Sequence, residues 1–239
     1  MTVDLEKITK EVRNVAPDCI IIVDGIQHSS HGAIDVQKYD IDGYVVSPYK
    51  MFSRHGYGVA WASDRLCTLN KEQLVDGPSQ NWELGTRDAG SYATFSDVVD
   101  YLDWLGSNFT ESENTRERLE ASSLAIKSHE QELLNLVLNG TKDITGLRNN
   151  KKIQIIGTSD SKFREGVVSF FQKNKPSSII VEELRQRKIR VHIRKDDHYC
   201  GNILRPLNQK DCIRFSVCHY NSKAEVVEFM KAINEISTN

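Results

Sequence analysis

The stretch that decides the fold runs from Cys19 to Leu66 and reads CIIIVDGIQHSSHGAIDVQKYDIDGYVVSPYKMFSRHGYGVAWASDRL. Residues 19–23 form a short run rich in β-branched side chains, which is typical of a strand buried on both faces of a parallel sheet. Residues 44–46 and 59–62 are two further apolar runs of strand length. The stretch therefore predicts three short strands of an α/β sheet.

Polar residues follow the first two of these strands. Asp24 comes directly after the first, and Ser47 and Lys50 come after the second. Ligands of open α/β sheets bind at the carboxyl ends of the strands, so we expect an acid and a lysine in one pocket. A lysine amine can form a Schiff base with an aldehyde, and a carboxylate can keep a pyridine nitrogen protonated. The alternative is that Asp24 is a turn residue and Lys50 a solvated surface lysine.

Four motifs in this stretch resemble the class V aminotransferase family, which includes cysteine desulfurases and isopenicillin N epimerase-like proteins. They are D-G-x-Q from Asp24, I-D-V from Ile34, D-x-Y-V-x-S-x-x-K from Asp42, and G-x-G-V from Gly56. The resemblance implies an α/β enzyme of fold type I that depends on pyridoxal 5'-phosphate (PLP) and acts on an amino acid.

The resemblance also implies a role for each polar residue of these motifs. Lys50 would hold PLP as the internal aldimine and then move the Cα proton of the substrate. Asp24 would pair with the pyridinium nitrogen, and Gln27 would face the phenolic oxygen of the ring. Ser47 and Tyr49 would contact the phosphate. Desulfurases carry S-G-H-K where this chain has S-P-Y-K, so Tyr49 replaces a histidine.

Residues 85–88, G-T-R-D, resemble the segment of the family dimer that sends a threonine into the neighbouring subunit's phosphate site. Thr86 would then bind the phosphate held by the partner subunit, with Arg87 next to that site. This role implies an isologous homodimer. From the residues alone, Thr86 is instead an N-cap for the helix predicted within residues 89–105.

A substrate-binding arginine is expected at position 214. Residues 214–222, R-F-S-V-C-H-Y-N-S, resemble the family's R-x-S-x-x-x-Y-N-T, in which the arginine binds the α-carboxylate of the substrate. A guanidinium group matches a carboxylate with two parallel hydrogen bonds. The alternative is that Arg214 is an edge-strand residue paired with a surface acid.

The segment R-K-D-D-H-Y-C-G-N places Cys200 in a loop similar to the R-x-G-H-H-C loop of desulfurases, in which the cysteine takes sulfur as a persulfide. The loop here has one residue more and lacks the glycine and the second histidine. Arg194, Lys195 and His198 could favour the thiolate form. The alternative is that Cys200 is a small apolar side chain.

Composition limits the function classes. The net charge of −2 over 239 residues gives no electrostatic case for binding nucleic acid or an anionic membrane. No apolar run approaches the ~18 residues of a membrane span. The five cysteines show no Cys-x-x-Cys spacing, so neither a metal site nor a disulfide framework is predicted, and a reducing cytoplasm fits.

The rest of the chain predicts a large-domain part over residues 1–107 and a long helix with a small α+β domain over residues 108–239. The predicted helices span residues 3–15, 97–105, 111–138, 176–187 and 223–236, and the C-terminal strands span residues 152–156, 167–171, 189–193 and 212–218. The long helix links the two parts, with the boundary near residues 107–110.

In the family the lysine lies near the middle of a much longer chain, whereas here it is residue 50. The resemblance therefore covers the C-terminal half of a class V enzyme, and the sequence is expected to be truncated relative to that family. Desulfuration, transamination and epimerisation stay open as reactions. The alternatives are a cysteine desulfurase proper that uses Cys200, and a non-catalytic remnant or interaction subunit, or a chain whose missing half is a separate polypeptide.

Overall fold

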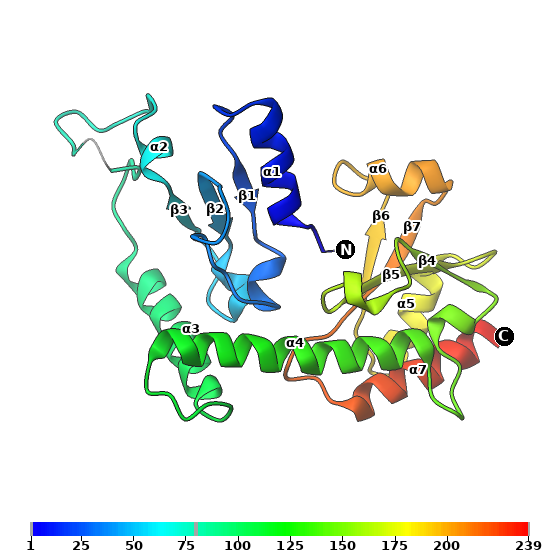
Figure 1. The fold of residues 1–239 in the computed structure, drawn as a ribbon. Helices are drawn as coiled ribbons and strands as arrows, with labels where there is room; N and C mark the ends of the chain where they lie inside the picture. The colour runs from blue at the N-terminus through cyan, green and yellow to red at the C-terminus, as the bar shows by residue number, and fades with distance from the viewer. Residues whose placement is uncertain (1, 79–80, 239) are drawn as a thin grey trace. The chain divides into compact units, whose positions relative to one another are not determined.

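A computed structural model describes residues 2–78 and 81–238 of the chain (Figure 1). These residues divide into two compact units. The N-terminal unit is Val3–Ala125, and the C-terminal unit comprises the residues from Ile126 onward together with Thr2. The division falls inside α4 (Thr115–Asn139), whereas the sequence pattern places a domain boundary between residues 107 and 108.

The N-terminal unit contains a three-stranded mixed sheet in the order β1-β2-β3. β1 runs parallel to β2, and β3 runs antiparallel to β2. Short 3₁₀ helices, η1 and η2, follow β1 and β2. The elements are α1 (Leu5–Val15), β1 (Ile22–Asp24), η1 (His28–Ser30), β2 (Gly43–Val46), η2 (Pro48–Met51), β3 (Val59–Ala62), α2 (Asp64–Cys67), α3 (Ala89–Gly106) and the first part of α4.

The prediction for the first strand is wrong in two respects. β1 begins at Ile22, and it is not buried on both faces, since Ile22 is 57% exposed and Asp24 is also exposed. Within the described part of the chain, β1 is an edge strand with β2 as its hydrogen-bonded neighbour. β2 is the buried strand of this sheet, and Tyr44 and Val46 enter its core with Met51 and Val98.

The C-terminal unit is built on an antiparallel sheet in the order β4-β5-β7-β6. The observed bounds lie within a few residues of the predicted ones, and β6 is an edge strand as expected. The elements are η3 (Leu147–Asn149), β4 (Ile153–Ile156), η4 (Ser161–Phe163), β5 (Val167–Gln172), α5 (Ser177–Gln186), β6 (His192–Lys195), α6 (Gly201–Leu204), η5 (Arg205–Leu207), β7 (Asp211–Ser216) and α7 (Lys223–Thr238).

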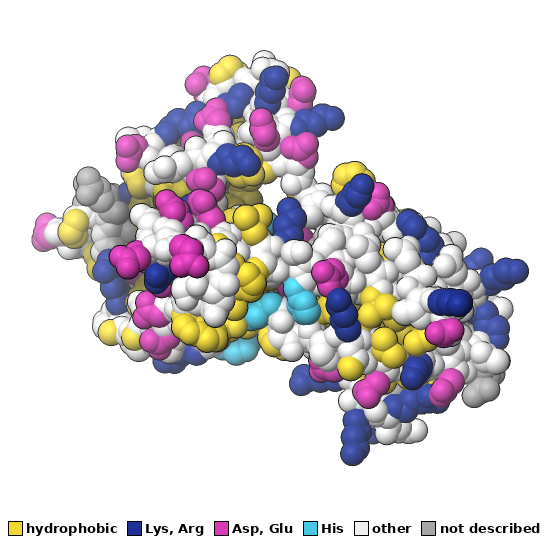
Figure 2. All heavy atoms as spheres, turned by 60° about the horizontal axis from the view of Figure 1, so that its bottom comes forward, with side chains coloured by type: hydrophobic (Ala, Val, Ile, Leu, Met, Phe, Trp, Pro, Cys, Tyr) yellow, Lys and Arg dark blue, Asp and Glu magenta, His cyan; other side chains and the backbone are white. Residues whose placement is uncertain are grey.

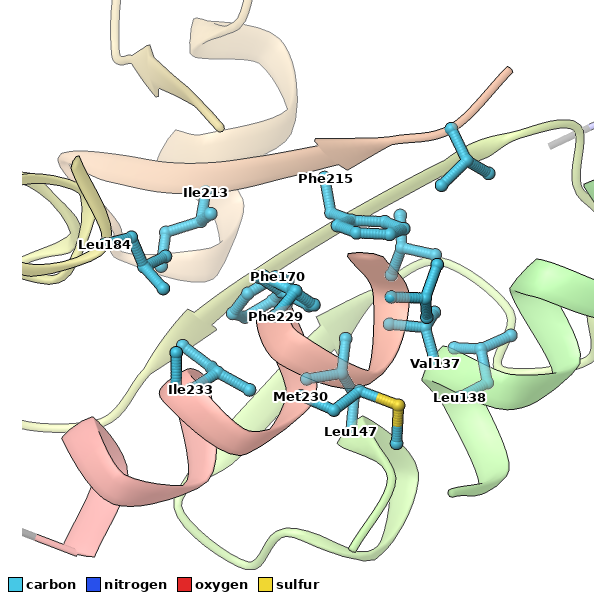
Figure 3. Close-up of a cluster of buried hydrophobic side chains, with 14 of the residues drawn as sticks. Val137, Leu138, Leu147, Phe170, Leu184, Ile213, Phe215, Phe229, Met230 and Ile233 are labelled. Carbon is cyan, nitrogen blue, oxygen red and sulfur yellow. The ribbon is translucent and has the colours of Figure 1, made fainter. Parts of the chain in front are cut away.

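The two faces of this sheet are covered differently. α5, α7 and the second part of α4 supply the large core on one face, where Phe170, Phe215 and Phe229 meet (Figure 3). The ring centroids of Phe215 and Phe229 lie 4.5 Å apart, and those of Phe170 and Phe229 lie 6.3 Å apart. A smaller cluster that includes Leu204 of α6 covers the other face.

The surface mixes charges of both signs. Basic and acidic side chains are interspersed over the face that Figure 2 shows, in keeping with the small net charge of the chain. Of the helices that the structure describes, none combines the length and the apolar composition needed to cross a membrane.

Candidate active site

Asp24 and Lys50 lie at the same edge of the N-terminal sheet, the one formed by the carboxyl ends of β1 and β2. Asp24 is the last residue of β1 and lies opposite Val45 in the parallel pairing with β2. Ser47 follows β2 directly, and Lys50 lies in η2 immediately beyond. Because the carboxyl ends of parallel strands share one edge, the carboxylate and the amine are delivered there by adjacent strands.

The turn after Asp24 requires a glycine. The Gly25 N–H donates to the carbonyl oxygen of Val45 at 3.0 Å, which holds the turn against β2. A Cβ on Gly25 would lie 2.2 Å from ring atoms of Tyr44, which is closer than any real side-chain contact. The Asp24 carboxylate accepts a hydrogen bond from the Ile26 N–H at 3.1 Å, so the backbone also fixes this acid.

We expect Gly25→Ala to destabilise the N-terminal unit, because the ring of the buried Tyr44 must move to admit the methyl group. Overpacking of this kind costs about 1–3 kcal/mol. Gly85→Ala is the matched control, since nothing lies within 4 Å of its Cβ position. Urea unfolding of the two variants measures the difference, and equal stabilities would contradict the close packing of Gly25 on Tyr44.

Lys50 is half-buried, and η2 fixes its backbone. Its N–H donates to the Ser47 carbonyl oxygen at 3.0 Å. The Nζ atom lies 5.7 Å from the centroid of the Tyr49 ring. Tyr49 in turn stacks on His55, with the ring centroids 4.3 Å apart. The sequence interpretation missed His55, whose signal is its place in H-G-Y-G just after the lysine motif.

Gln27 and Thr86 are both exposed. Gln27 precedes η1 and so lies beyond the same end of β1 as Asp24. Thr86 lies outside any helix or strand, and the alternative that it caps the following helix is wrong. The N-cap of α3 is Asp88, whose carboxylate accepts hydrogen bonds from the Ser91 N–H at 3.2 Å and the Ser91 hydroxyl at 2.8 Å. These bonds lower the pKa of Asp88.

Arg87 pairs with a neighbouring acid, Glu83. The hydrogen bond from Arg87 lowers the pKa of Glu83, and the Tyr92 hydroxyl donates to the same carboxyl group at 3.0 Å. The Arg87 guanidinium is therefore directed along its own segment.

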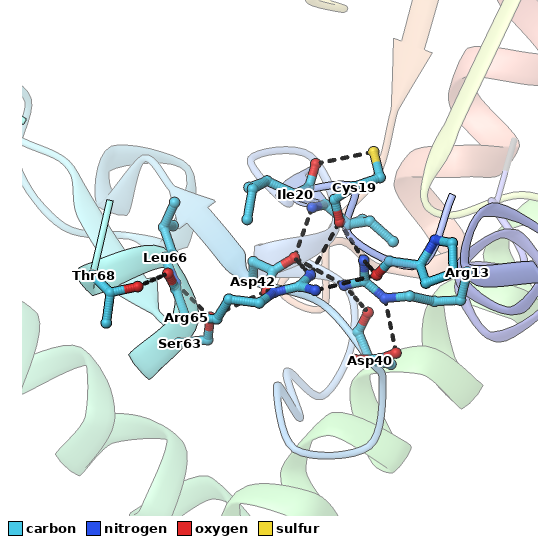
Figure 4. Close-up of polar contacts among 11 residues, drawn as sticks. Arg13, Cys19, Ile20, Asp40, Asp42, Ser63, Arg65, Leu66 and Thr68 are labelled. Carbon is cyan, nitrogen blue, oxygen red and sulfur yellow. Dashed lines mark hydrogen bonds and ion pairs between the residues drawn. The ribbon is translucent and has the colours of Figure 1, made fainter. Parts of the chain in front are cut away.

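A buried ion-pair network at Asp42 was not predicted from the sequence (Figure 4). The Asp42 carboxylate accepts hydrogen bonds from Arg13 of α1 at 2.9 Å and from Arg65 of α2 at 2.7 and 2.5 Å. It also accepts from the Ile21 N–H at 2.8 Å and the Ser63 hydroxyl at 3.2 Å. Arg65 above all holds the pKa of Asp42 far below its usual range. The network joins α1 and α2 to the segments that enter β1 and β2.

Arg214 lies in the C-terminal unit, on β7 between two neighbouring strands. It stands opposite Ser169 of β5 and His192 of β6, so the three side chains leave the same face of the sheet. Burial lowers the pKa of His192, and the charge of Arg214 lowers it further. The charge of Arg214 therefore acts on His192 across the pairing of β7 with β6.

Cys200 lies on the same side of the C-terminal sheet. It is the N-cap residue of α6 and is half-buried. The Asp197 carboxylate accepts hydrogen bonds from the backbone N–H groups of Tyr199 and Cys200, both at 2.9 Å. Cys200 packs against the cluster that contains Cys212, which is two residues before Arg214 on β7.

The predicted site residues thus fall into two groups. Asp24, Gln27, Ser47, Tyr49 and Lys50 gather at one edge of the N-terminal sheet, and Thr86 belongs to the same unit. Cys200 and Arg214 share one face of the C-terminal sheet. Within residues 2–78 and 81–238, no group of three or more His, Cys, Asp and Glu side chains could hold a metal ion.

The donor set at the N-terminal sheet edge fits a phosphorylated pyridine aldehyde. An amine is present for the aldehyde at Lys50, a carboxylate for the ring nitrogen at Asp24, and hydroxyl groups for the phosphate at Ser47 and Tyr49. The turn at Gly25 carries no side chain, because the Tyr44 ring occupies the space that one would take.

Parts of known proteins are similar to this chain in sequence. Residues 1–229 match the family model described as Aminotransferase class-V. A cysteine desulfurase of Synechococcus elongatus is 28% identical over 238 residues, which cover 91% of this chain and 33% of the relative. The aminotransferase-like protein FGM3 of Gibberella zeae is 27% identical, over 98% of this chain and 56% of its own. The chain thus spans a third to just over half of these relatives.

Solved structures show the same fold at lower identity. An apo cysteine desulfurase from Thermococcus onnurineus NA1 superposes with a TM-score of 0.75 at 20% identity, covering 98% of this chain and 56% of that chain. The cysteine desulfurase CsdA from Escherichia coli gives a TM-score of 0.72 at 20% identity and covers 98% and 55%. The architecture is therefore the α/β fold of fold-type I enzymes, and by the match of its sequence over residues 1–229 the chain belongs to the class V aminotransferase family.

Proposed function

We propose that this chain supplies the lysine half of a PLP-dependent enzyme that acts at the α-carbon of an amino acid. The observation that carries the proposal is the delivery of Asp24 and Lys50 to one sheet edge by two adjacent parallel strands. When bound, PLP supplies an electron sink for bonds at the α-carbon. The family of the chain supports the same conclusion.

Each residue at this edge has a distinct task in the proposal. Lys50 binds the cofactor covalently and then moves the proton at the substrate α-carbon through its Nζ atom. Asp24 holds a proton on the ring nitrogen, and Gln27 donates to the phenolic oxygen. Ser47 and Tyr49 donate hydrogen bonds from their hydroxyl groups to the phosphate.

Two further residues complete the proposal. Arg214 binds the α-carboxylate of the amino acid, and so orients the bond that breaks. Thr86 binds the phosphate held by a second subunit. Its side chain is exposed and lies outside any helix or strand, so it is accessible to that subunit. We propose a homodimer in the cytoplasm as the working form.

Lys50→Ala tests the proposal. We expect the purified wild-type chain, mixed with PLP, to gain the visible absorbance of PLP bound to a protein amine, and Lys50→Ala to lose it. Lys38→Ala is the matched control, because the Nζ of Lys38 lies 5.6 Å from the centroid of the Tyr39 ring, much as that of Lys50 lies over Tyr49. Its absorbance should match the wild type.

Two outcomes would redirect the proposal. If the wild-type chain gains no absorbance either alone or after co-expression with a family N-terminal half, the non-catalytic interaction subunit becomes the better description. If Lys50→Ala keeps the absorbance, Lys50 does not hold the cofactor.

A cysteine desulfurase proper is the second candidate. It is favoured by the half-buried Cys200, held at a turn by Asp197, and by relatives that are named cysteine desulfurases. Cys200 would take the sulfur of a cysteine substrate as a persulfide. Loss of sulfide release in Cys200→Ser, with the PLP absorbance retained, would support it, whereas unchanged release would exclude it.

A further inference from the structure

Two of the five cysteines belong to one apolar cluster of the C-terminal unit. Along β7, Cys212 alternates with Ile213, so its side chain leaves the sheet on the face opposite the large core. There it is buried with Phe171 and Leu204, and Cys200 packs against the same cluster. The two thiols therefore lie in one apolar cluster, to which they come from different elements.

Backbone hydrogen bonds hold the segment between them in this arrangement. The register of β6 and β7 places Arg194 opposite Cys212. The Asp196 N–H then donates to the Lys210 carbonyl oxygen at 2.9 Å, which closes the base of the loop. At its far side the Leu204 N–H donates to the Cys200 carbonyl oxygen at 3.0 Å. The loop therefore folds back on the strand that carries Cys212.

The two thiols differ in access to solvent. Cys200 is half-buried, whereas Cys212 is 4% exposed. Burial, and next the nearby Cys200, raise the pKa of Cys212 to about 11. Cys200 is therefore the thiol that a dissolved oxidant meets first, and Cys212 the one that meets an oxidised Cys200.

We propose that Cys200 and Cys212 form a reversible disulfide when a small peroxide oxidises Cys200. The Cys200 sulfur attacks hydrogen peroxide, the O–O bond breaks, and Cys200 becomes a sulfenic acid while water leaves. The Cys212 sulfur then attacks that sulfur, the S–O bond breaks, and the Cys212 proton leaves with the hydroxide as a second water. Two thiols thus give up two electrons to one peroxide.

The disulfide has two consequences for the protein. It withdraws Cys200 from any other chemistry until a dithiol reduces it, and it protects that sulfur from irreversible oxidation. It also ties the loop to β7 next to Arg214. The proposal does not depend on PLP, so it survives or fails independently of the function proposed above.

Peptide mapping tests the disulfide directly. Trypsin cuts after Lys195, Lys210 and Arg214, and the cut after Lys210 separates the two thiols. The Arg205–Pro206 bond resists cleavage, so residues 196–210 stay in one peptide. After peroxide treatment and alkylation of the remaining thiols, we expect residues 196–210 and 211–214 to appear as one cross-linked species. Its mass should be about 2 Da below the sum of the two reduced peptides, and a dithiol should separate them.

Variants decide whether Cys212 is the partner. In Cys212→Ser and in the smaller Cys212→Ala, Cys200 should pass on to the sulfinic acid, several-fold faster than in the wild type. Cys218→Ser is the matched control, since Cys218 is also buried and follows the same strand. Recovery of residues 196–210 as a separate alkylated or sulfinic peptide from the oxidised wild type, or a cross-link to another cysteine, would overturn the proposal.

Discussion

Asp42→Ala is expected to lower the free energy of unfolding of the N-terminal unit by about 2–3 kcal/mol, because a buried carboxylate that accepts several hydrogen bonds is lost. The Asp42 side chain is 4% exposed and lies between two guanidinium groups. Without it, Arg65 loses this carboxylate, Arg13 keeps only the exposed Asp40, and the Ile21 N–H loses its acceptor. Urea unfolding with hydrogen exchange over residues 3–125 measures the loss.

Asp40→Ala is the matched control for that experiment. Asp40 contacts the same Arg13 at 2.8 Å, but its side chain is 74% exposed. Exposed ion pairs contribute about 0–1 kcal/mol, so this variant should stay close to the wild type. Equal losses in the two variants would show that burial does not decide the strength of the network.

The effect of Asp42 should also depend on pH in one direction. The pKa of its carboxyl group is lowered in the folded chain, so its stabilisation is complete above the pKa of an unfolded aspartate. The stabilisation is lost as the pH falls below that value and the native carboxylate is protonated. The unfolding free energies of the wild type and Asp42→Ala should therefore converge in acid, and a constant difference would contradict the pairing.

Phe229→Ala is expected to destabilise the C-terminal unit by about 3–5 kcal/mol. Phe229 is 2% exposed and touches aromatic rings from β5 and β7, as Figure 3 shows. Its removal leaves a cavity between α7 and the sheet, which the rigid strands cannot close. Hydrogen exchange should rise in β5, β7 and α7, and urea unfolding should report the loss of stability.

Phe163→Ala provides the comparison within the same unit. Phe163 has the same side chain but is 57% exposed, so its truncation removes little buried surface. We expect a change of about 0.5 kcal/mol or less. A loss at Phe163 as large as that at Phe229 would mean that the cluster in Figure 3 is not the main core of this unit.

Local pattern predicted much of the fold. The Val59–Ala62 strand is observed with the predicted bounds, and α4 begins and ends within a few residues of the predicted helix. The strand has a strong apolar pattern. The helix ends at Asn139, before Gly140, which adopts φ 83°. β1 was predicted less well. The pattern of residues 19–23 does not show which strands pair with β1, and that pairing determines which of its side chains are exposed.

Contacts between distant residues limited the prediction of the site. The sheet edge with Asp24 and Lys50 follows from two strand ends within one motif-rich stretch. The network at Asp42 gave no such signal, because its partner Arg13 lies 29 residues away on α1. The sequence pattern singled out Cys200 alone, and only the turn around Asp197 and the β6–β7 register show that it shares a cluster with Cys212.

The position of β1 at the rim of its sheet has a practical consequence. Its outer N–H and C=O groups face away from β2, and Ile22 adds apolar surface beside them. Such a rim is a template with which an extended segment of another chain can pair, and so a site of aggregation. Ile22→Lys, which adds charge to this rim, should therefore slow the aggregation of concentrated preparations, as light scattering during storage would measure.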